Sequence, residues 1–207
     1  AAKYTGKDFW LGVMNFSDWN QTAAVQFDNP ALPIIDDAFY RVVDIVYSPI
    51  TRHYSYYTGR ELRVSKINTI VPYTERVKLL RLERLDGIDG SYDDFFKDSF
   101  FRLCSLPHWS SFMPNFAFCE VLKYCESYDA LKKFVSDKLI PLFWVEHRYF
   151  LELGLKRIFY NIFKNSLVDG KVLLGYLAKL REEKDATLAQ IGKDLINHNQ
   201  KGSWVFM

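Results

Sequence analysis

The sequence has few of the features that most readily reveal a function. Only 10 of its 207 residues are glycine, and they do not cluster into the loop that cradles a nucleotide phosphate. A nucleophile elbow and the HExxH zinc motif are also missing. The sequence therefore favours a non-catalytic protein that needs no cofactor.

Cysteine is scarce as well. Cys104, Cys119 and Cys125 are an odd number in a chain long enough to bury a core without disulfides. This usage indicates a reducing compartment, and we expect a cytoplasmic protein. With His108 the cysteines read C-x3-H-x10-C-x5-C, which lacks the closely spaced cysteine pairs of structural zinc sites. We expect buried thiols and no bound metal.

No long uncharged apolar run is present. The longest apolar stretch, residues 140–163, is interrupted by six charged or titratable side chains, whereas a membrane-spanning helix needs about 20 mostly apolar residues. The first residues, AAKYTGKDFW, lack the apolar segment of a signal peptide. We expect a soluble protein that does not insert into a membrane.

A large excess of positive charge is also missing. The 27 basic and 25 acidic side chains give a net charge of +2, less than a broad nucleic-acid-binding face usually carries. A local basic and aromatic cluster in region 54–84 keeps nucleic-acid binding open as an alternative. That cluster comprises Tyr56, Arg76, Lys78, Arg81 and Arg84. Intervening glutamates dilute it, so a solvated strand face is favoured.

The most acidic stretch, DGIDGSYDD at residues 86–94, raises the question of a cation loop. A helical calcium loop has glycine at its sixth position and oxygen ligands around it. Placing Gly90 there puts Leu85 and Gly87 where acidic residues belong. We therefore interpret the stretch as a turn and a helix start, with Ser91 as the N-cap and acidic residues in the first turn.

The first part of the chain has mixed periodicity. Segments 8–16 and 23–27 have strand length, and residues 34–47 place apolar side chains at helical spacing. Residues 52–84 alternate and predict a three-stranded antiparallel meander, with a turn at Gly59 and a slip, such as a bulge, in the last strand.

From residue 91 onward the periodicity is helical. We predict helices over 91–107, 115–126, 128–139 with Ser127 as its cap, 142–164, 171–184 and 185–199. The helix at 142–164, which Pro141 can begin, should be the longest and the hub of the bundle.

The predicted fold class is thus α+β and mainly α. Short antiparallel strands and one helix over 1–90 pack on a helical bundle over 91–207, and we expect the two to form one continuous domain. The bundle core is predicted to include Phe95, Phe96, Phe100, Leu122, Phe134, Leu139, Phe150, Leu153, Phe159, Leu173, Leu177 and Ile191.

What the chain has in excess is aromatic residues, which make up 17% of it. Several aromatic segments are too polar or too loop-like to be wholly core: FWLGVMNFSDW (9–19), RHYSYY (52–57), PHWSSFMPNF (107–116) and GSWVFM (202–207). Aromatic residues and methionine dominate interface anchors. We expect a protein-interaction module (an adaptor, inhibitor or assembly component) whose partner is another protein, anchored by Trp109, Phe112, Met113 and Trp204.

A catalytic site assembled in space stays open as a second alternative. The triplet Glu146-His147-Arg148 has the most catalytic character, because it combines an acid, a base and a cation on a predicted buried helix. More commonly such a triplet is a solvated notch at the end of an apolar helix.

Overall fold

The computed structural model describes residues 2–6, 8–45, 54–64, 66–105 and 115–198. The chain divides into two compact units, Ala1–Asp98 and Ser99–Met207, and the boundary falls within one helix. Helix accounts for 51% and strand for 22% of the structure. The α+β, mainly helical fold class is therefore confirmed.

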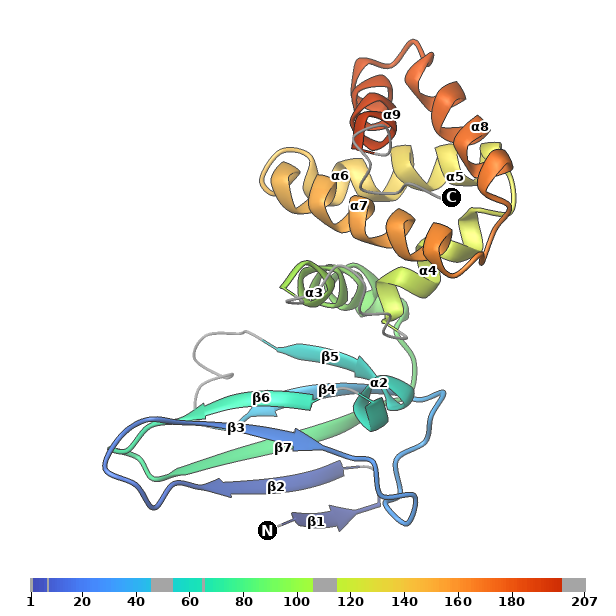
Figure 1. Ribbon diagram of the computed structural model, residues 1–207. Helices are drawn as coiled ribbons and strands as arrows, with labels where there is room; N and C mark the ends of the chain where they lie inside the picture. Colours follow the sequence, from blue (N-terminus) through green and yellow to red (C-terminus); the bar gives the residue numbers. More distant parts are fainter. Residues whose placement is uncertain (1, 7, 46–53, 65, 106–114, 199–207) are drawn as a thin grey trace. The chain divides into compact units, whose positions relative to one another are not determined.

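The first unit contains two antiparallel sheets (Figure 1). A five-stranded sheet has the order β1-β2-β7-β4-β5, and β3 and β6 form a two-stranded sheet. The elements are β1 (Ala2–Thr5), β2 (Asp8–Met14), β3 (Gln21–Gln26), β4 (Phe39–Asp44), β5 (Ser55–Thr58), α2 (Gly59–Val64), β6 (Lys66–Val71) and β7 (Val77–Leu85).

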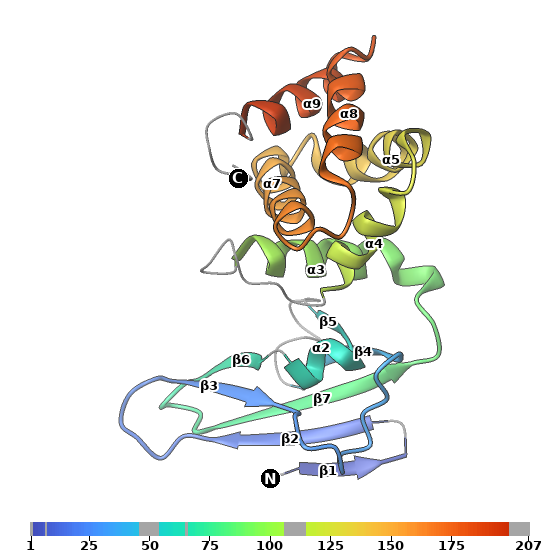
Figure 2. The same ribbon diagram turned by 45° about the vertical axis from the view of Figure 1, so that its right-hand side comes forward.

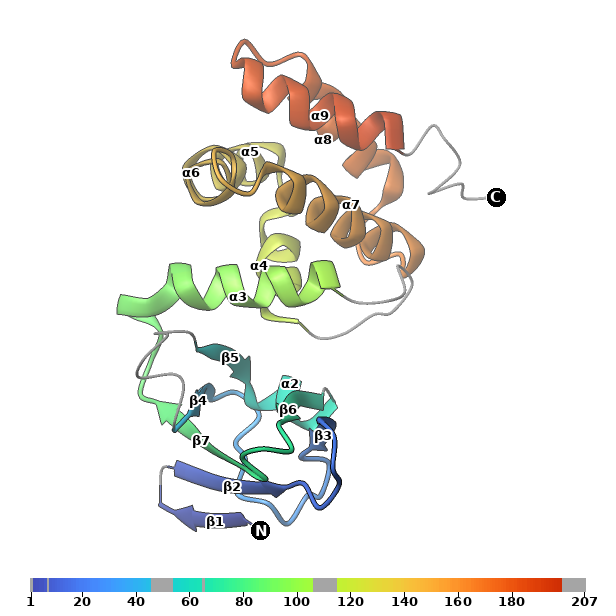
Figure 3. The same ribbon diagram turned by 90° about the vertical axis from the view of Figure 1, so that its left-hand side faces the viewer.

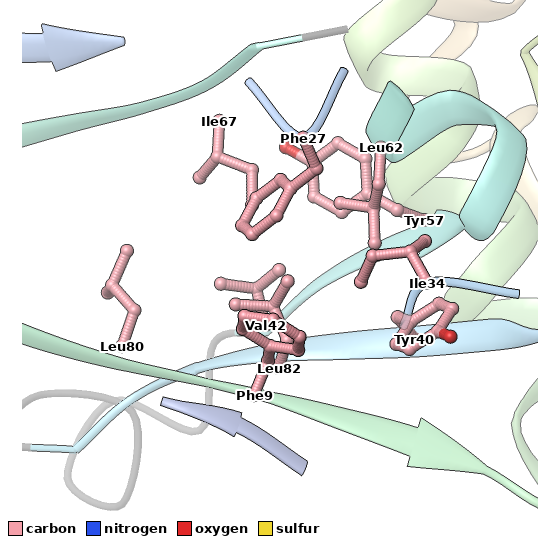
Figure 4. Close-up of a cluster of buried hydrophobic side chains, with 10 residues drawn as sticks. All are labelled: Phe9, Phe27, Ile34, Tyr40, Val42, Tyr57, Leu62, Ile67, Leu80 and Leu82. Carbon is pink, nitrogen blue, oxygen red and sulfur yellow. The ribbon is translucent and has the colours of Figure 1, made fainter. Parts of the chain in front are cut away.

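The core of this unit lies on one face of the larger sheet (Figure 4). Successive side chains of a strand point to opposite faces, so Leu80 and Leu82 of β7 share the face that meets Ile67 of β6. Phe9 of β2 is the Cα partner of Leu82, and Leu62 of α2 completes the cluster. All five side chains are at most 5% exposed.

The predicted helix over 34–47 is wrong, because the structure has a turn and then a strand there. The backbone turns at Ala38, whose N–H donates to the Ile35 carbonyl (3.1 Å), and β4 begins at Phe39. The β-branched Val42 and Val43 suit a strand. Strands β5 and β7 pair with β4 on its two sides, and local spacing cannot show such distant partners.

The predicted meander is also wrong, although three strands do occur within 52–84. β5 pairs with β4, β6 with β3, and β7 with both β2 and β4. The expected turn at Gly59 is the start of α2, where an added Cβ would lie 1.9 Å from the Ile35 carbonyl oxygen. β7 keeps continuous register with both neighbours and has no slip.

The remaining elements are helical (Figure 2). They are η1 (Asp89–Ser91), α3 (Tyr92–Ser105), α4 (Phe116–Tyr124), α5 (Tyr128–Phe134), η2 (Val135–Leu139), α6 (Ile140–Phe143), α7 (Arg148–Lys164), α8 (Gly170–Arg181) and α9 (Ala186–His198). The Ser127 cap is confirmed, since its hydroxyl accepts from the Ala130 N–H (3.2 Å). Asp93 and Asp94 occupy the first turn of α3 as predicted, while Ser91 lies in η1.

The predicted helix over 142–164 is shorter than expected. Pro141 lies in the first turn of the four-residue helix α6, which continues from α5 through the π-helical turn η2. In that turn the Ile140 N–H donates to the Val135 carbonyl, one residue further back than in an α-helix. The backbone then leaves helical geometry at His147 (φ −133°, ψ 30°), and α7 starts at Arg148.

Helix α7 is nevertheless the hub of the second unit. It contacts α4, α6 and α9, and nine of its residues are buried. At its N-terminal end an ion pair joins Arg148 and Glu152 (2.8 Å), which are four residues apart. Nine of the predicted core residues are confirmed as buried: Phe95, Phe96, Phe100, Phe134, Leu139, Phe159, Leu173, Leu177 and Ile191.

Three predicted core residues differ. Leu122 and Leu153 are half-buried. Phe150 is 40% exposed because it lies in the first turn of α7, at the end of the buried segment rather than in its middle. Among the residues that the structure describes, none of the helices combines the length and apolar character needed to cross a lipid bilayer.

Candidate functional site

Two loops of the first unit meet beside the ends of β2 and β7. The β2–β3 loop (residues 15–20) and the β6–β7 loop (residues 72–76) are joined by hydrogen bonds from the Asn15 N–H to the Arg76 carbonyl (2.8 Å) and from the Tyr73 N–H to Asn20 Oδ1 (3.2 Å). The Arg76 guanidinium also donates to the Ser17 carbonyl (3.2 Å). The two loops therefore form one connected structure.

Asn15 organises this structure from the inside. Its side chain is almost fully buried, and its amide group donates to the carbonyls of Trp19 (2.8 Å) and Val71 (3.0 Å). Its Oδ1 accepts from the N–H and the hydroxyl of Ser17 (2.9 and 2.7 Å). All four hydrogen-bonding positions of the amide are thereby used, which fixes the path of the loop.

Arg76, the last residue of the β6–β7 loop, also helps to fix the loop backbone. This residue has φ 61°, a left-handed conformation that is uncommon for residues other than glycine. Its backbone groups accept from Asn15 and donate to Pro72 (2.9 Å), so the hydrogen bonds of both loops hold it there. An exposed ion pair with Asp18 (3.3 Å) adds a weak link.

These ordered loops present large apolar side chains to water. Phe16 is 86% exposed and Trp19 is 67% exposed, and three neighbours on the same loops and strand ends are also exposed. We define the aromatic tip as Met14, Phe16, Trp19, Tyr73 and Val77. Single exposed apolar residues are ordinary, but a group of them on one ordered feature is typical of an interaction site.

The sequence found part of the aromatic tip. Segment 9–19 was expected to expose aromatic surface, and its second half does, through Phe16 and Trp19. Tyr73 and Val77 were not expected. Predicting that they belong to the tip would have required knowing that β2 pairs with β7, since this pairing makes Val77 the Cα partner of Met14.

The four expected anchors, Trp109, Phe112, Met113 and Trp204, lie outside the described residues. Segment 52–57 was also expected to expose aromatic surface, but its Tyr56 and Tyr57 are buried. The Tyr56 ring packs against Phe95 (centroids 5.4 Å apart), and burial raises the pKa of its hydroxyl. Tyr56 is therefore not available for base stacking.

The structure does not bring the basic residues together. Lys78 and Arg84 alternate with Arg81 along β7 and so point to the opposite face of the sheet. Lys78 forms a half-buried ion pair with Asp44 (2.6 Å). Arg81 pairs with Glu83 and lies over the Trp10 ring (5.6 Å). Arg76, as described above, is engaged by the loops.

Glu146 and His147 lie on the turn before α7. Glu146 Oε2 is 3.7 Å from His147 Nε2, and the glutamate side chain is largely exposed. The His147 ring also lies edge-on to the rings of Phe101 (5.1 Å) and Phe150 (6.3 Å). Among the described residues, no hydrogen bond joins the His147 side chain to a serine hydroxyl or a cysteine thiol, as a catalytic nucleophile would require.

The three cysteines all lie in the described part, and no disulfide joins them. Cys104 and Cys125 are buried, and burial raises the pKa of each thiol to about 12. Cys119 is exposed, so the expectation that all three are buried is wrong for this residue, which faces away from the core on α4. Within the described ranges, no group of three or more metal-ligating side chains comes together.

One surface pocket of about 500 Å³ lies at the connection between α7 and α8, lined in part by Phe163, Ser166 and Leu174. Asp169 at its rim is already used, because its Oδ1 accepts from the backbone N–H groups of Lys171 and Val172 and so caps α8. None of the site residues expected from the sequence lines this pocket. The aromatic tip is therefore the stronger candidate site.

No protein-family model, curated protein or solved structure matches this chain.

Proposed function

We propose that this chain is a non-catalytic protein-interaction module that binds another protein through the aromatic tip. The observation that carries the proposal is the exposure of Phe16 and Trp19 on loops whose backbone is held by the buried side chain of Asn15. A role as an adaptor, inhibitor or assembly component fits a protein that acts through contacts of the aromatic tip and without catalysis.

The energetics of the tip support binding to an apolar surface. Burying a large apolar side chain contributes roughly 1.5–3 kcal/mol, so Phe16 and Trp19 together can supply a central anchor. The two loops are already joined by hydrogen bonds, and binding therefore loses little conformational entropy. Exposed polar neighbours such as Asp18 and Glu75 would form the rim of such an interface.

The test compares partner capture by three full-length proteins: the wild type, the tip variant Phe16→Ser/Trp19→Ser and the control variant Val145→Ser/Val172→Ser. Val145 and Val172 are also exposed apolar residues (91% and 44%), but they belong to the second unit, which contributes neither of the two loops. Proteins cross-linked in extracts of the source cells are quantified by mass spectrometry. We expect the tip variant to reduce capture of the partner about tenfold or more.

The control variant should retain capture, and circular dichroism should show that both variants are folded. Parallel samples of Trp109→Ala and Trp204→Ala test whether the anchors outside the described residues contribute. If the tip variant captures the same proteins as the wild type, the aromatic tip is not the binding site. Binding lost equally in the control variant would also contradict the proposal.

A further inference from the structure

Strand β3 has an open edge. It pairs with β6 alone, and among the described residues its backbone makes no hydrogen bond to any other element. Figure 3 shows β3 on the outer side of β6. A strand with one unpaired row of N–H and C=O groups can accept another strand.

The other open edges of the two sheets are blunted. On β5, the Tyr56 N–H donates to Asp98 Oδ2 (2.8 Å), so a side chain from α3 already occupies that edge. β6 carries a lysine at its first position, Lys66, and the carbonyl of Val71 accepts from Asn15. β1 also contains a lysine, Lys3. Edge lysines and occupied backbone groups are the usual protections against strand addition.

β3 has neither protection. Its sequence, QTAAVQ, contains no charged residue and no proline, and Thr22 and Ala24 are exposed on its outer face. The small side chains of Ala23 and Ala24 at its centre leave room for a neighbouring strand. Because a two-stranded sheet is marginal by itself, an added strand would also stabilise the β3–β6 pair.

We propose that β3 pairs with the β3 strand of a second copy of this chain, antiparallel and across a two-fold axis, to form a continuous four-stranded sheet. A two-fold axis makes an edge contact antiparallel and places the same segment on both sides. With the axis at Ala24, each Ala24 faces Ala24 of the other copy, Thr22 faces Gln26, and Ala23 faces Val25. No like charges meet at any of these positions.

The absence of charge favours a second copy over a different protein. An edge that selects a foreign partner commonly uses charge to do so, and β3 offers none. This inference goes beyond the proposed function, because the aromatic tip takes no part in it.

The test is sedimentation of the full chain over a range of concentrations, from about 1 μM to about 1 mM, where weak dimers of small interface area form. The wild type should show a concentration-dependent dimer. Ala24→Lys places two lysines close to the axis and should weaken dimerisation about tenfold. Asn68→Lys is the matched control, because Asn68 is the Cα partner of Ala24 and is also exposed, on β6.

Hydrogen exchange at low and high protein concentration gives a second measurement that needs no variant. Amide protons of residues 21–26 should exchange more slowly at high concentration, and those of β6 should be unchanged. The tip variant Phe16→Ser/Trp19→Ser should dimerise like the wild type, which separates this proposal from the previous one. A monomer at every concentration, or equal weakening by Ala24→Lys and Asn68→Lys, would overturn it.

Discussion

At the scale of single residues, Asn15 has the largest influence on the candidate site. A buried amide that satisfies all of its hydrogen bonds fixes one backbone path, whereas the same loop without it would lose the hydrogen bonds that tie its backbone to β6. Asn15 joins Ser17 and Trp19 of its own loop to Val71 at the end of β6. The buried side chain of Asn15 therefore fixes the loop backbone that carries the exposed aromatic rings.

We predict that Asn15→Ala lowers the free energy of unfolding by about 1–3 kcal/mol, because the buried amide and its hydrogen bonds to the Val71 and Trp19 carbonyls are lost, and only the Ser17 hydroxyl can still donate to Trp19. Urea denaturation measures this change. Asn68→Ala, on an exposed position of β6, is the control and should change stability by less than about 0.5 kcal/mol. Equal effects of the two variants would show that the Asn15 network does not stabilise the loops.

At the scale of elements, the helices of the second unit approach one another closely where a side chain is absent. Gly154 of α7 faces the Phe100 ring of α3, and an added Cβ would lie 2.3 Å from that ring and 3.1 Å from the Cys104 sulfur. Gly175 of α8 is exposed, and a Cβ there would meet nothing within 4 Å. Adding a Cβ atom at these two helical glycines should therefore change stability in opposite directions.

We predict that Gly154→Ala lowers the free energy of unfolding by about 1–3 kcal/mol, since overpacking outweighs the gain of up to about 1 kcal/mol in helix propensity. Gly175→Ala should raise it by about 0.5–1 kcal/mol, because only the propensity term applies. Thermal and urea unfolding of both variants check the signs. A stabilising Gly154→Ala would mean that α3 and α7 are less closely packed than the structure shows.

At the scale of the whole molecule, positive and negative charges are nearly balanced, and basic side chains such as Lys78 and Arg81 have acidic partners. The net charge is +2, and cations of the 54–84 region are held by nearby carboxylates, as Lys78 is by Asp44 and Arg81 by Glu83. Nucleic-acid binding driven by phosphate contacts requires several cations on one surface.

We predict that fluorescence anisotropy will detect no binding of labelled single-stranded or duplex DNA or RNA at micromolar protein and about 0.15 M salt. A second series at low salt separates weak, non-specific attraction from a real site, because only the former disappears as salt is added. Binding that persists at about 0.15 M salt, and that Arg81→Gln or Lys78→Gln weakens, would instead support the nucleic-acid alternative.

The sequence alone determined the fold class, the positions of most helices and much of the helical core. Residues 92–105, 116–124, 170–181 and 186–198 are helical, as their apolar spacing predicted, because a helix forms its hydrogen bonds within itself. Helix caps such as Ser127 could be predicted for the same reason, because a cap is a contact between residues a few positions apart.

The tertiary structure decided the strand pairing and the candidate site. Segment 39–44 is a strand because β5 and β7 supply its hydrogen-bond partners, and no local pattern shows which distant segments will do so. The aromatic tip likewise depends on the meeting of two loops more than 50 residues apart, joined through Asn15 and Val71. Local spacing fixes which side chains can share a face, but only the packing of distant segments fixes which of them water can reach.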